Sequence, residues 1–323
     1  MSQTSLSPSS ACIIIASHIS NPKRITHLIE CLTSLVYQTL PIAIYLSISF
    51  ETQELQHEFS VIFSENQHLC TDLLFIVIRD KKTPQMRHMN LLLPHILEHK
   101  REWVMFCDDD DTYNSQRVYT ILQTIVNAID TVSRMPGNIL AGVYESNIHK
   151  DHREQRHEYW CYCVHISMLT RFMGTISQYE DVLDNTCCDV LFGEYLRRAH
   201  PDLVYGIINT PLYNYRVENN SDSITGTIQR LNKTIRKPRL ITETNHEECA
   251  RELSEYLDTE IDIYLHDFYL RTLVGMDFES ILRNEFLDEY VIWDLVDKKH
   301  RERITSYHER LRDICNMIYD VKL

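Results

Sequence analysis

Apolar residues in the first 130 positions alternate between short continuous runs and helical stripes. The continuous runs have the length of buried strands and lie at Ala11–Ala16, Ile42–Ser49, Leu73–Ile78 and Trp103–Cys107. Between them, apolar residues recur every three or four positions at 25–36, 86–97 and 118–129, which predicts three amphipathic helices. Asn21-Pro22 suits the start of the first helix, with Asn as the N-cap and Pro in the first turn.

Strands that alternate with helices at this spacing predict an α/β fold with a mainly parallel sheet. In such sheets ligands bind beyond the carboxyl ends of the strands. The run Trp103–Cys107 leads directly into Asp108-Asp109-Asp110-Asp111. These four aspartates are therefore the first functional signal in the sequence.

The residue pattern changes near position 229: beyond it, charged and apolar residues interleave at helical spacing. Ile304, Tyr307, Leu311, Ile314 and Ile318 form one amphipathic stripe. We therefore expect an α/β domain at 1–228 and a helical C-terminal region at 229–323. The stripe is expected to pack on its own domain, with a homodimer contact as the alternative.

Composition narrows the function classes. The net charge of −14 argues against a nucleic-acid partner, because phosphate contacts need a basic face. Seven scattered glycines exclude a G-x-G-x-x-G turn and a G-x-x-x-x-G-K-[ST] loop.

No apolar run has the length of a membrane span or a signal-peptide core, so we expect a cytoplasmic protein, with peripheral membrane contact left open. Cys161, Cys163 and His165 are expected to share one strand face rather than to bind a metal.

The aspartate cluster admits three interpretations. In an extended backbone Asp108 and Asp110 point to the same side, and paired carboxylates suit Mg²⁺ or Mn²⁺ together with substrate phosphates. A polar turn before a helix is the structural alternative. Asp108, Asp110 and Thr112 also match the D-x-D-x-[TV] pattern of phosphotransferases, in which the first Asp is a nucleophile. That pattern normally follows the first strand, whereas here three predicted strands precede it.

Three segments resemble the nucleotide-binding half of family 2 glycosyltransferases of the GT-A fold, as found in bacteria and large DNA viruses. They are ACIIIASHISNPKRITHLIECLTSLVYQTLPIAIYLSIS, RDKKTPQMRHMNLL and WVMFCDDDDTYNSQRV, in the family's order and spacing. The resemblance implies a Rossmann-like GT-A fold, with a nucleotide-sugar half at about 11–120 and an acceptor half at 121–228. A later segment, PLYNYRVENNSDSIT, resembles the family's Y-R-x-H-x-x-S stretch but lacks its histidine.

The resemblance also implies roles for individual residues. The expected donor-binding residues are Ser17, His18, Ser49, Arg87, Asp108 and Asp109. The expected metal ligands are Asp110, as the principal one, and Asp108, for Mn²⁺ or Mg²⁺. Ser49 stands where the family usually has an aspartate for the base.

The family's catalytic base lies at the start of a helix in the acceptor half. Asp189 in NTCCDVLFGEYLRR is the favoured candidate, and Asp181 in QYEDVLD is the alternative. The resemblance thus implies an inverting, metal-dependent transfer of a hexose or pentose from a nucleotide sugar, with UDP favoured, to a glycan, glycolipid or glycoprotein acceptor. A phosphatase or phosphotransferase and a non-catalytic nucleotide- or glycan-binding module remain as alternatives.

Overall fold

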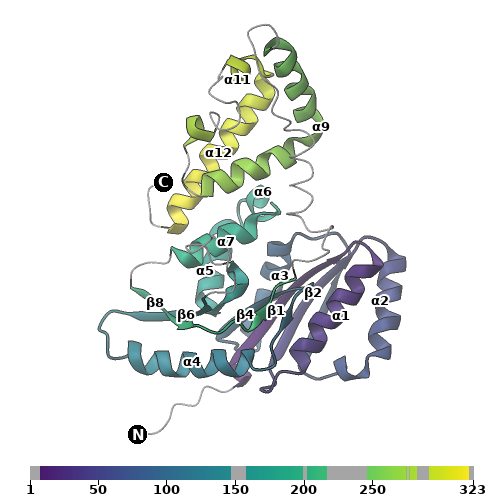
Figure 1. Cartoon of the computed structure of the whole chain (residues 1–323), viewed down its shortest axis with the longest axis vertical. Helices are drawn as coiled ribbons and strands as arrows, with labels where there is room; N and C mark the ends of the chain where they lie inside the picture. Colours follow the sequence, from purple (N-terminus) through teal and green to yellow (C-terminus); the bar gives the residue numbers. More distant parts are fainter. Residues whose placement is uncertain are drawn as a thin grey trace. The chain divides into compact units, whose positions relative to one another are not determined.

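The computed structural model describes residues 8–146, 158–198, 202–216, 246–273, 275, 277–281 and 291–319. The chain divides into two compact units (Figure 1). The first comprises Met1–Asp184 with Cys188–Val217, and the second comprises Asn185–Cys187 with Glu218–Leu323. The predicted boundary between 228 and 229 lies outside the described residues, as does the end of the PLYNYRVENNSDSIT segment after 216.

A seven-stranded sheet with the order β3-β2-β1-β4-β7-β6-β8 organises the described part of the first unit. Its strands pair in parallel except at β7, which is antiparallel to both of its neighbours. The predicted α/β class with a mainly parallel sheet is therefore confirmed. The strands are β1 (Ala11–Ile19), β2 (Ala43–Phe50), β3 (Leu74–Arg79), β4 (Trp103–Asp108), β6 (Ile139–Glu145), β7 (Tyr162–His165) and β8 (Leu203–Ile208); a separate small ladder joins β5 (Thr112–Tyr113) to β9 (Tyr213–Asn214).

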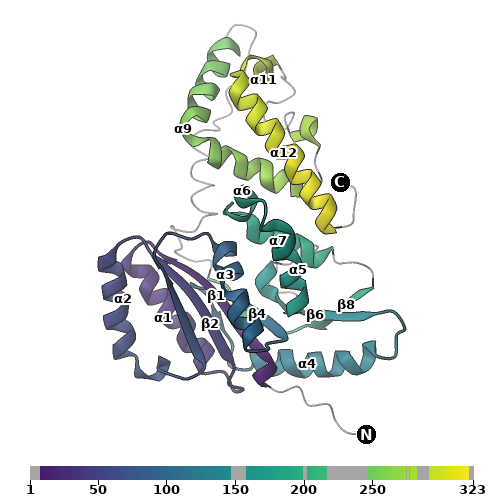
Figure 2. The same cartoon turned by 180° about the vertical axis from the view of Figure 1, so that it is seen from behind.

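Helices cover both faces of this sheet. Helices α1 and α2 lie over one face and α3 over the other, as the two opposite views show (Figures 1 and 2). Helix α4 packs on β6 and β8, and α7 packs on α3. The helices of this unit are α1 (Pro22–Val36), α2 (Gln53–Glu65), α3 (Gln85–Glu98), α4 (Arg117–Val132), α5 (Ile166–Ile176), α6 (Glu180–Leu183) and α7 (Cys188–Arg197), with short 3₁₀ turns η1 (Pro8–Ser10), η2 (Gln67–Leu69) and η3 (Tyr159–Cys161).

Local sequence explains these elements. The apolar run of β1 is buried along nearly its whole length, as expected for a central strand covered on both faces. Asn21 caps α1, because its side-chain oxygen accepts a hydrogen bond from the Arg24 backbone N–H at 3.3 Å, and Pro22 fills the first helical position. Pro94 lies inside α3 with its ring exposed, and the helix continues past it to Glu98.

The cysteine expectation is partly wrong. Cys161 ends the 3₁₀ turn η3, before β7 begins, so it does not alternate with Cys163 and His165 along one strand. The aromatic residues Tyr159 and Trp160 precede it in the same buried turn, which draws the chain into the core before the strand starts.

The register of the central strands brings their carboxyl ends together at one edge of the sheet. Ala16 in β1 pairs with Asp108 at the end of β4, and His18 pairs with Ser49 near the end of β2. Because these strands are parallel, the residues that follow them lie at one edge of the sheet. Ser17, His18, Ser49 and the aspartates are thereby positioned at that edge.

The second unit is helical in its described parts. Its helices are α9 (His246–Leu273), α11 (Val291–Leu295) and α12 (Lys298–Tyr319), and both α11 and α12 contact α9. The five residues of the predicted stripe on α12 are all buried. Among the described residues, none of the helices combines the length and apolar character needed to cross a membrane.

Candidate active site

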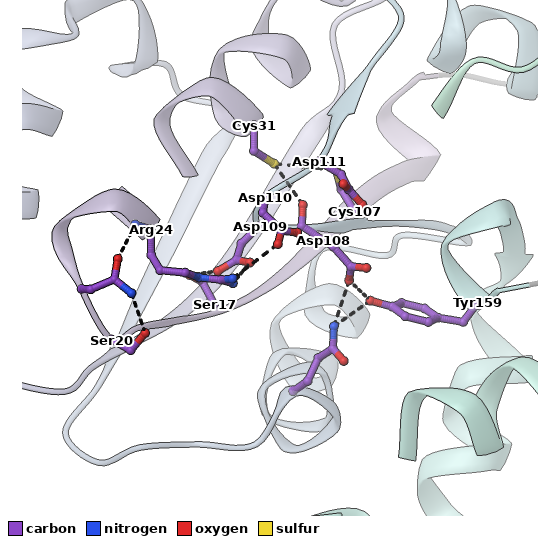
Figure 3. Close-up of polar contacts among 12 residues, drawn as sticks. Ser17, Ser20, Arg24, Cys31, Cys107, Asp108, Asp109, Asp110, Asp111 and Tyr159 are labelled. Atoms are coloured by element: carbon purple, nitrogen blue, oxygen red, sulfur yellow. Dashed lines mark hydrogen bonds and ion pairs between the residues drawn. The ribbon is translucent and has the colours of Figure 1, made fainter. Parts of the chain in front are cut away.

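A tight turn at the end of β4 holds the four aspartates. The Asp111 backbone N–H donates to the Asp108 carbonyl at 3.2 Å, so the extended backbone stops at Asp108. The two residues after the four aspartates, Thr112 and Tyr113, form β5, which pairs with β9. The period-two alternation that predicts Asp108 and Asp110 on one side therefore does not continue through the cluster. Figure 3 shows Asp109 and Asp110 in contact with Arg24, and Asp108 in contact with Tyr159.

Asp109 and Asp110 share a cation that the sequence reasoning did not identify. Arg24, in the first turn of α1, donates from one guanidinium nitrogen to Asp109 Oδ1 and from the other to Asp110 Oδ2 at 3.3 Å (Figure 3). The Ser17 hydroxyl donates to Asp109 Oδ2 at 2.6 Å. Both oxygens of Asp109 are thus engaged by the protein, whereas Asp110 is held through one oxygen among these contacts.

Asp108 faces a different set of side chains. The Tyr159 hydroxyl donates to Asp108 Oδ1, and the Gln85 amide donates to the same oxygen at 2.9 Å. Gln85 also donates to the Tyr159 hydroxyl at 2.8 Å. Residues from α3 and η3, which are distant in sequence from β4, therefore orient this carboxylate (Figure 3).

Asp111 anchors the chain beyond β9. The Tyr213 hydroxyl donates to Asp111 Oδ2 at 2.8 Å and accepts from the Asp108 backbone N–H at 3.0 Å. The Arg216 backbone N–H donates to Asp111 Oδ1 at 2.7 Å. Asp111 is thus a structural member of the cluster that fixes the segment after β9 beside the aspartate turn.

Crowding of carboxylates at a partly buried strand end changes their ionisation. Burial raises the pKa of Asp108 well above its usual range, and the charges of Asp111 and Asp110 raise it further. Burial also raises the pKa of Asp109, against the opposing effect of Arg24. The pKa of Asp111 rises to about 7, first through burial and then through repulsion by Asp110. The cluster therefore favours the binding of positive charge.

His18 and Ser49, two of the predicted donor-binding residues, lie in one hydrogen-bonded chain. His18 Nδ1 is 2.9 Å from the Ser49 hydroxyl, and its Nε2 is 2.8 Å from a carboxylate oxygen of Glu51. On its other side Ser49 is 3.2 Å from His88 Nε2, and Ser47 is 2.8 Å from His88 Nδ1. Burial lowers the pKa of His88 to about 4, so this ring is neutral near pH 7. His88 was not identified from the sequence; its place on the buried face of α3, next to Met89, was the available signal.

Arg87 lies apart from the aspartate contacts. Its guanidinium binds the Asp184 carboxylate with two hydrogen bonds, at 2.5 and 2.8 Å, on the side where α3 meets the loop after α6. Its predicted role in donor binding stays a prediction.

Asp189 lies in the first turn of α7 and is half-buried. Its charge contributes to the raised pKa of both Asp108 and Tyr159, which places it within electrostatic reach of the cluster. Asp181, the alternative base, is exposed on the short helix α6.

The donor set of the cluster suits a hard divalent cation. Within the described parts of the chain, no group of three or more His, Cys, Asp or Glu side chains is arranged as a complete metal shell. Mg²⁺ in phosphate chemistry, however, is commonly held by one or two carboxylates, with waters and substrate phosphates as its other ligands. Asp110 and Asp108 supply oxygens of this kind, in a cluster where burial, and after it repulsion by neighbouring aspartates, raises the carboxyl pKa of Asp108. The residues therefore fit a metal that is bound together with a diphosphate.

Several solved protein structures are similar in fold to this chain, at low sequence identity. No protein-family model and no curated protein sequence matches the chain. Similar solved structures include TarS of S. aureus, at 12% identity and a TM-score of 0.44 over 96% of this chain and 55% of that chain. TarS 1–349 in complex with UDP matches at 13% identity and a TM-score of 0.44, over 96% and 90% of the two chains. The mannosyltransferase PcManGT from Pyrobaculum calidifontis, in complex with GDP-Man and Mn²⁺, matches at 13% and 0.45, over 95% and 86%.

This chain thus spans about half the length of the first of these proteins, which it covers at 55%. At such identities and TM-scores we assign no residue role and no substrate from them.

Proposed function

We propose that this protein is a glycosyltransferase that moves a sugar from a nucleoside diphosphate sugar, with UDP as the favoured nucleotide, to a hydroxyl group of a glycan, glycolipid or glycoprotein. One observation carries the proposal: the D-x-D carboxylates stand at the carboxyl end of the central strand β4, at the edge of the parallel sheet where Ser17, His18 and Ser49 also lie. Carboxylates at this edge can hold a cation, and Asp189 in the first turn of α7 offers a separate carboxylate for proton transfer; this transfer needs both. The resemblance of three sequence segments to family 2 glycosyltransferases supports the same reaction.

The leaving group of the reaction is a nucleoside diphosphate, whose developing negative charge must be neutralised. A Mn²⁺ or Mg²⁺ ion held by Asp110 and Asp108 supplies this neutralisation when bound. Tyr159 and Gln85 fix the Asp108 carboxylate, and Asp111 fixes the backbone turn through Tyr213. Preorganised ligands of this kind lose little freedom when substrate binds.

Asp189 is assigned the role of general base. Its carboxylate accepts the proton of the acceptor hydroxyl while that oxygen attacks the anomeric carbon, which contributes about 10²–10⁴-fold to the rate. A single displacement with one base inverts the anomeric configuration. Ser17, His18 and Ser49 line the edge next to the aspartates and are assigned to the nucleoside part of the donor.

The test is turnover. UDP- and GDP-sugars are incubated with the protein and Mn²⁺, and release of the nucleoside diphosphate is measured. The proposal predicts release that requires the metal and is lost in Asp110→Asn and Asp189→Asn. Asp181→Asn, a matched change at the exposed alternative base, is expected to keep most of the activity.

Two results would contradict the proposal. Release of inorganic phosphate in place of a nucleoside diphosphate would favour the phosphotransferase interpretation. Metal-dependent binding of nucleotide without any turnover, over a panel of sugars and acceptors, would favour a binding module. An active enzyme with Asp189→Asn unchanged would leave the reaction class intact and remove Asp189 as the base.

A further inference from the structure

Arg24 stands out because its guanidinium is in direct contact with the D-x-D segment and the function proposed above has not used it. Its guanidinium bridges Asp109 Oδ1 and Asp110 Oδ2, and 18% of the side chain is exposed. The Asp110 side chain is 15% exposed. Both partners are therefore reachable from solvent although they lie at the edge of the core.

The backbone of Arg24 is fixed in the first turn of α1. Its N–H donates to the Asn21 carbonyl at 3.1 Å and to the Asn21 side chain at 3.3 Å, within the capped first turn of α1. Three methylene groups and a guanidinium extend from this fixed point. A guanidinium binds phosphate oxygens with the same two-pronged geometry as it binds carboxylates.

A divalent ion at Asp110 would compete with this arrangement. The ion and the guanidinium carry like charges and would share one small carboxylate, so each weakens the binding of the other. Asp109 alone does not replace the contact that Arg24 would lose at Asp110, because the second oxygen of Asp109 already accepts a hydrogen bond from Ser17 at 2.6 Å. A diphosphate that enters with the ion offers Arg24 new anionic oxygens close to its present ones.

We propose that Arg24 closes the metal position at Asp110 while no nucleotide is bound, and that its guanidinium transfers to the diphosphate when metal and donor bind together. This inference rests on the proposed function, because the diphosphate and the metal are those of the donor site. Its consequence is that metal and nucleotide bind cooperatively: each binds weakly alone and strengthens the other, by equal factors in both directions.

The experiment measures Mn²⁺ binding by the electron paramagnetic resonance signal of free Mn²⁺, with and without UDP and then GDP. The unmodified protein is compared with Arg24→Gln, Arg24→Lys and Lys23→Gln. Lys23 is the exposed neighbour on the same helical turn, so Lys23→Gln removes the same charge without cutting the contacts to Asp109 and Asp110. Thermal melting of each variant verifies that it is folded, and Arg24→Lys keeps the charge should Arg24→Gln fail to fold.

We expect Arg24→Gln to bind Mn²⁺ in the absence of nucleotide about tenfold more tightly than the unmodified protein, since a part-buried competing charge is worth about that factor. Lys23→Gln should change this affinity by less than about twofold, because exposed charges interact weakly. The factor by which nucleotide strengthens Mn²⁺ binding should fall in Arg24→Gln. In Arg24→Lys this factor should lie between those of the unmodified protein and Arg24→Gln. Unchanged or weaker Mn²⁺ binding in Arg24→Gln, or an equal gain in Lys23→Gln, would overturn the inference.

The two proposals fail in different ways. If neither nucleotide binds under any condition, the glycosyltransferase proposal and the transfer of Arg24 to a diphosphate fall together. The competition between Arg24 and Mn²⁺ is still decided by the nucleotide-free measurement. If nucleotide and metal bind and sugar is transferred but Arg24→Gln leaves both affinities unchanged, only the inference about Arg24 is wrong.

Discussion

Replacing Arg117 by methionine would leave Glu145 as an uncompensated negative charge inside the first unit. Arg117 begins α4 and Glu145 ends β6, and both side chains are 0% exposed where the guanidinium donates to the carboxylate. A second guanidinium nitrogen donates to the Trp160 carbonyl at 2.9 Å, and the guanidinium carbon lies 4.0 Å from the centre of the Tyr113 ring. The substitution removes all of these contacts while it keeps much of the side-chain volume.

The size of the effect follows from this burial. Breaking a buried ion pair by removal of one partner costs about 3–5 kcal/mol of unfolding free energy. Glu145 Oε2 still accepts from the backbone N–H groups of Leu212 and Tyr213, at 2.8 and 3.1 Å, which puts the expected loss near the lower end of that range. Because Tyr213 begins β9 and its hydroxyl holds Asp111, the substitution should also loosen the aspartate edge.

Urea unfolding followed by tryptophan fluorescence measures this loss, since Trp103 and Trp160 both report on the first unit. Arg117→Met combined with Glu145→Gln should recover about 1–2 kcal/mol, because the amide keeps an acceptor for the backbone and carries no charge. Lys82→Met, which breaks an exposed pair with Glu51 in the same unit, should cost less than about 0.5 kcal/mol. If the free energy of unfolding falls by less than about 1 kcal/mol in Arg117→Met, Glu145 does not depend on Arg117 for the compensation of its buried charge.

Three further outcomes are expected. The pKa of His88 is lowered to about 4, so the stability that its neutral ring contributes is complete above pH 6.5. This contribution is lost, by up to about 3 kcal/mol, as the pH falls from 6.5 to 4. Melting temperatures measured against pH should therefore fall less steeply on the acid side in His88→Gln, but not in His95→Gln, which changes an exposed histidine on the same helix. Tyr159→Phe removes a donor that orients Asp108, so Mn²⁺-dependent nucleotide affinity measured by calorimetry should fall about tenfold, and an unchanged affinity would mean that Asp108 is no metal ligand. Leu311→Ala in α12 should cost about 2–5 kcal/mol in urea unfolding, whereas the exposed Met317→Ala should stay within about 0.5 kcal/mol; equal effects would mean that the stripe is not packed.

Much of the architecture could be predicted because it depends on short-range patterns. The run ACIIIA marks a strand buried on both faces, and Asn21-Pro22 marks the start of α1, since capping and burial act within a few residues. The edge of the sheet at Asp108 follows from the same patterns, because parallel strands end together. The Cys161 expectation failed for a related reason: alternation predicts a strand, and nothing local reveals that the chain forms a 3₁₀ turn first.

The contacts that organise the site could not be predicted in the same way. Tyr159 is 51 positions from Asp108, and Tyr213 is 102 positions from Asp111, so no local pattern links them. Arg24 lies on the turn after β1 and meets the aspartates only because β1 and β4 are neighbours in the sheet. The order of strands is a tertiary property, and the partners of a carboxylate follow from that order.

Thermal stability with UDP, GDP, CDP and dTDP, each with and without Mn²⁺, measures whether the aspartate cluster binds a metal ion together with a nucleoside diphosphate. A ligand at 100 times its dissociation constant stabilises the folded protein by about 2.7 kcal/mol, which gives a clear shift of the melting temperature. We expect one diphosphate to raise the melting temperature, and only when the metal is present. The rise should disappear in Asp110→Ala and persist in Asp130→Asn, which changes an exposed aspartate on α4. No shift with any diphosphate, or a shift independent of both Mn²⁺ and Asp110, would contradict this expectation.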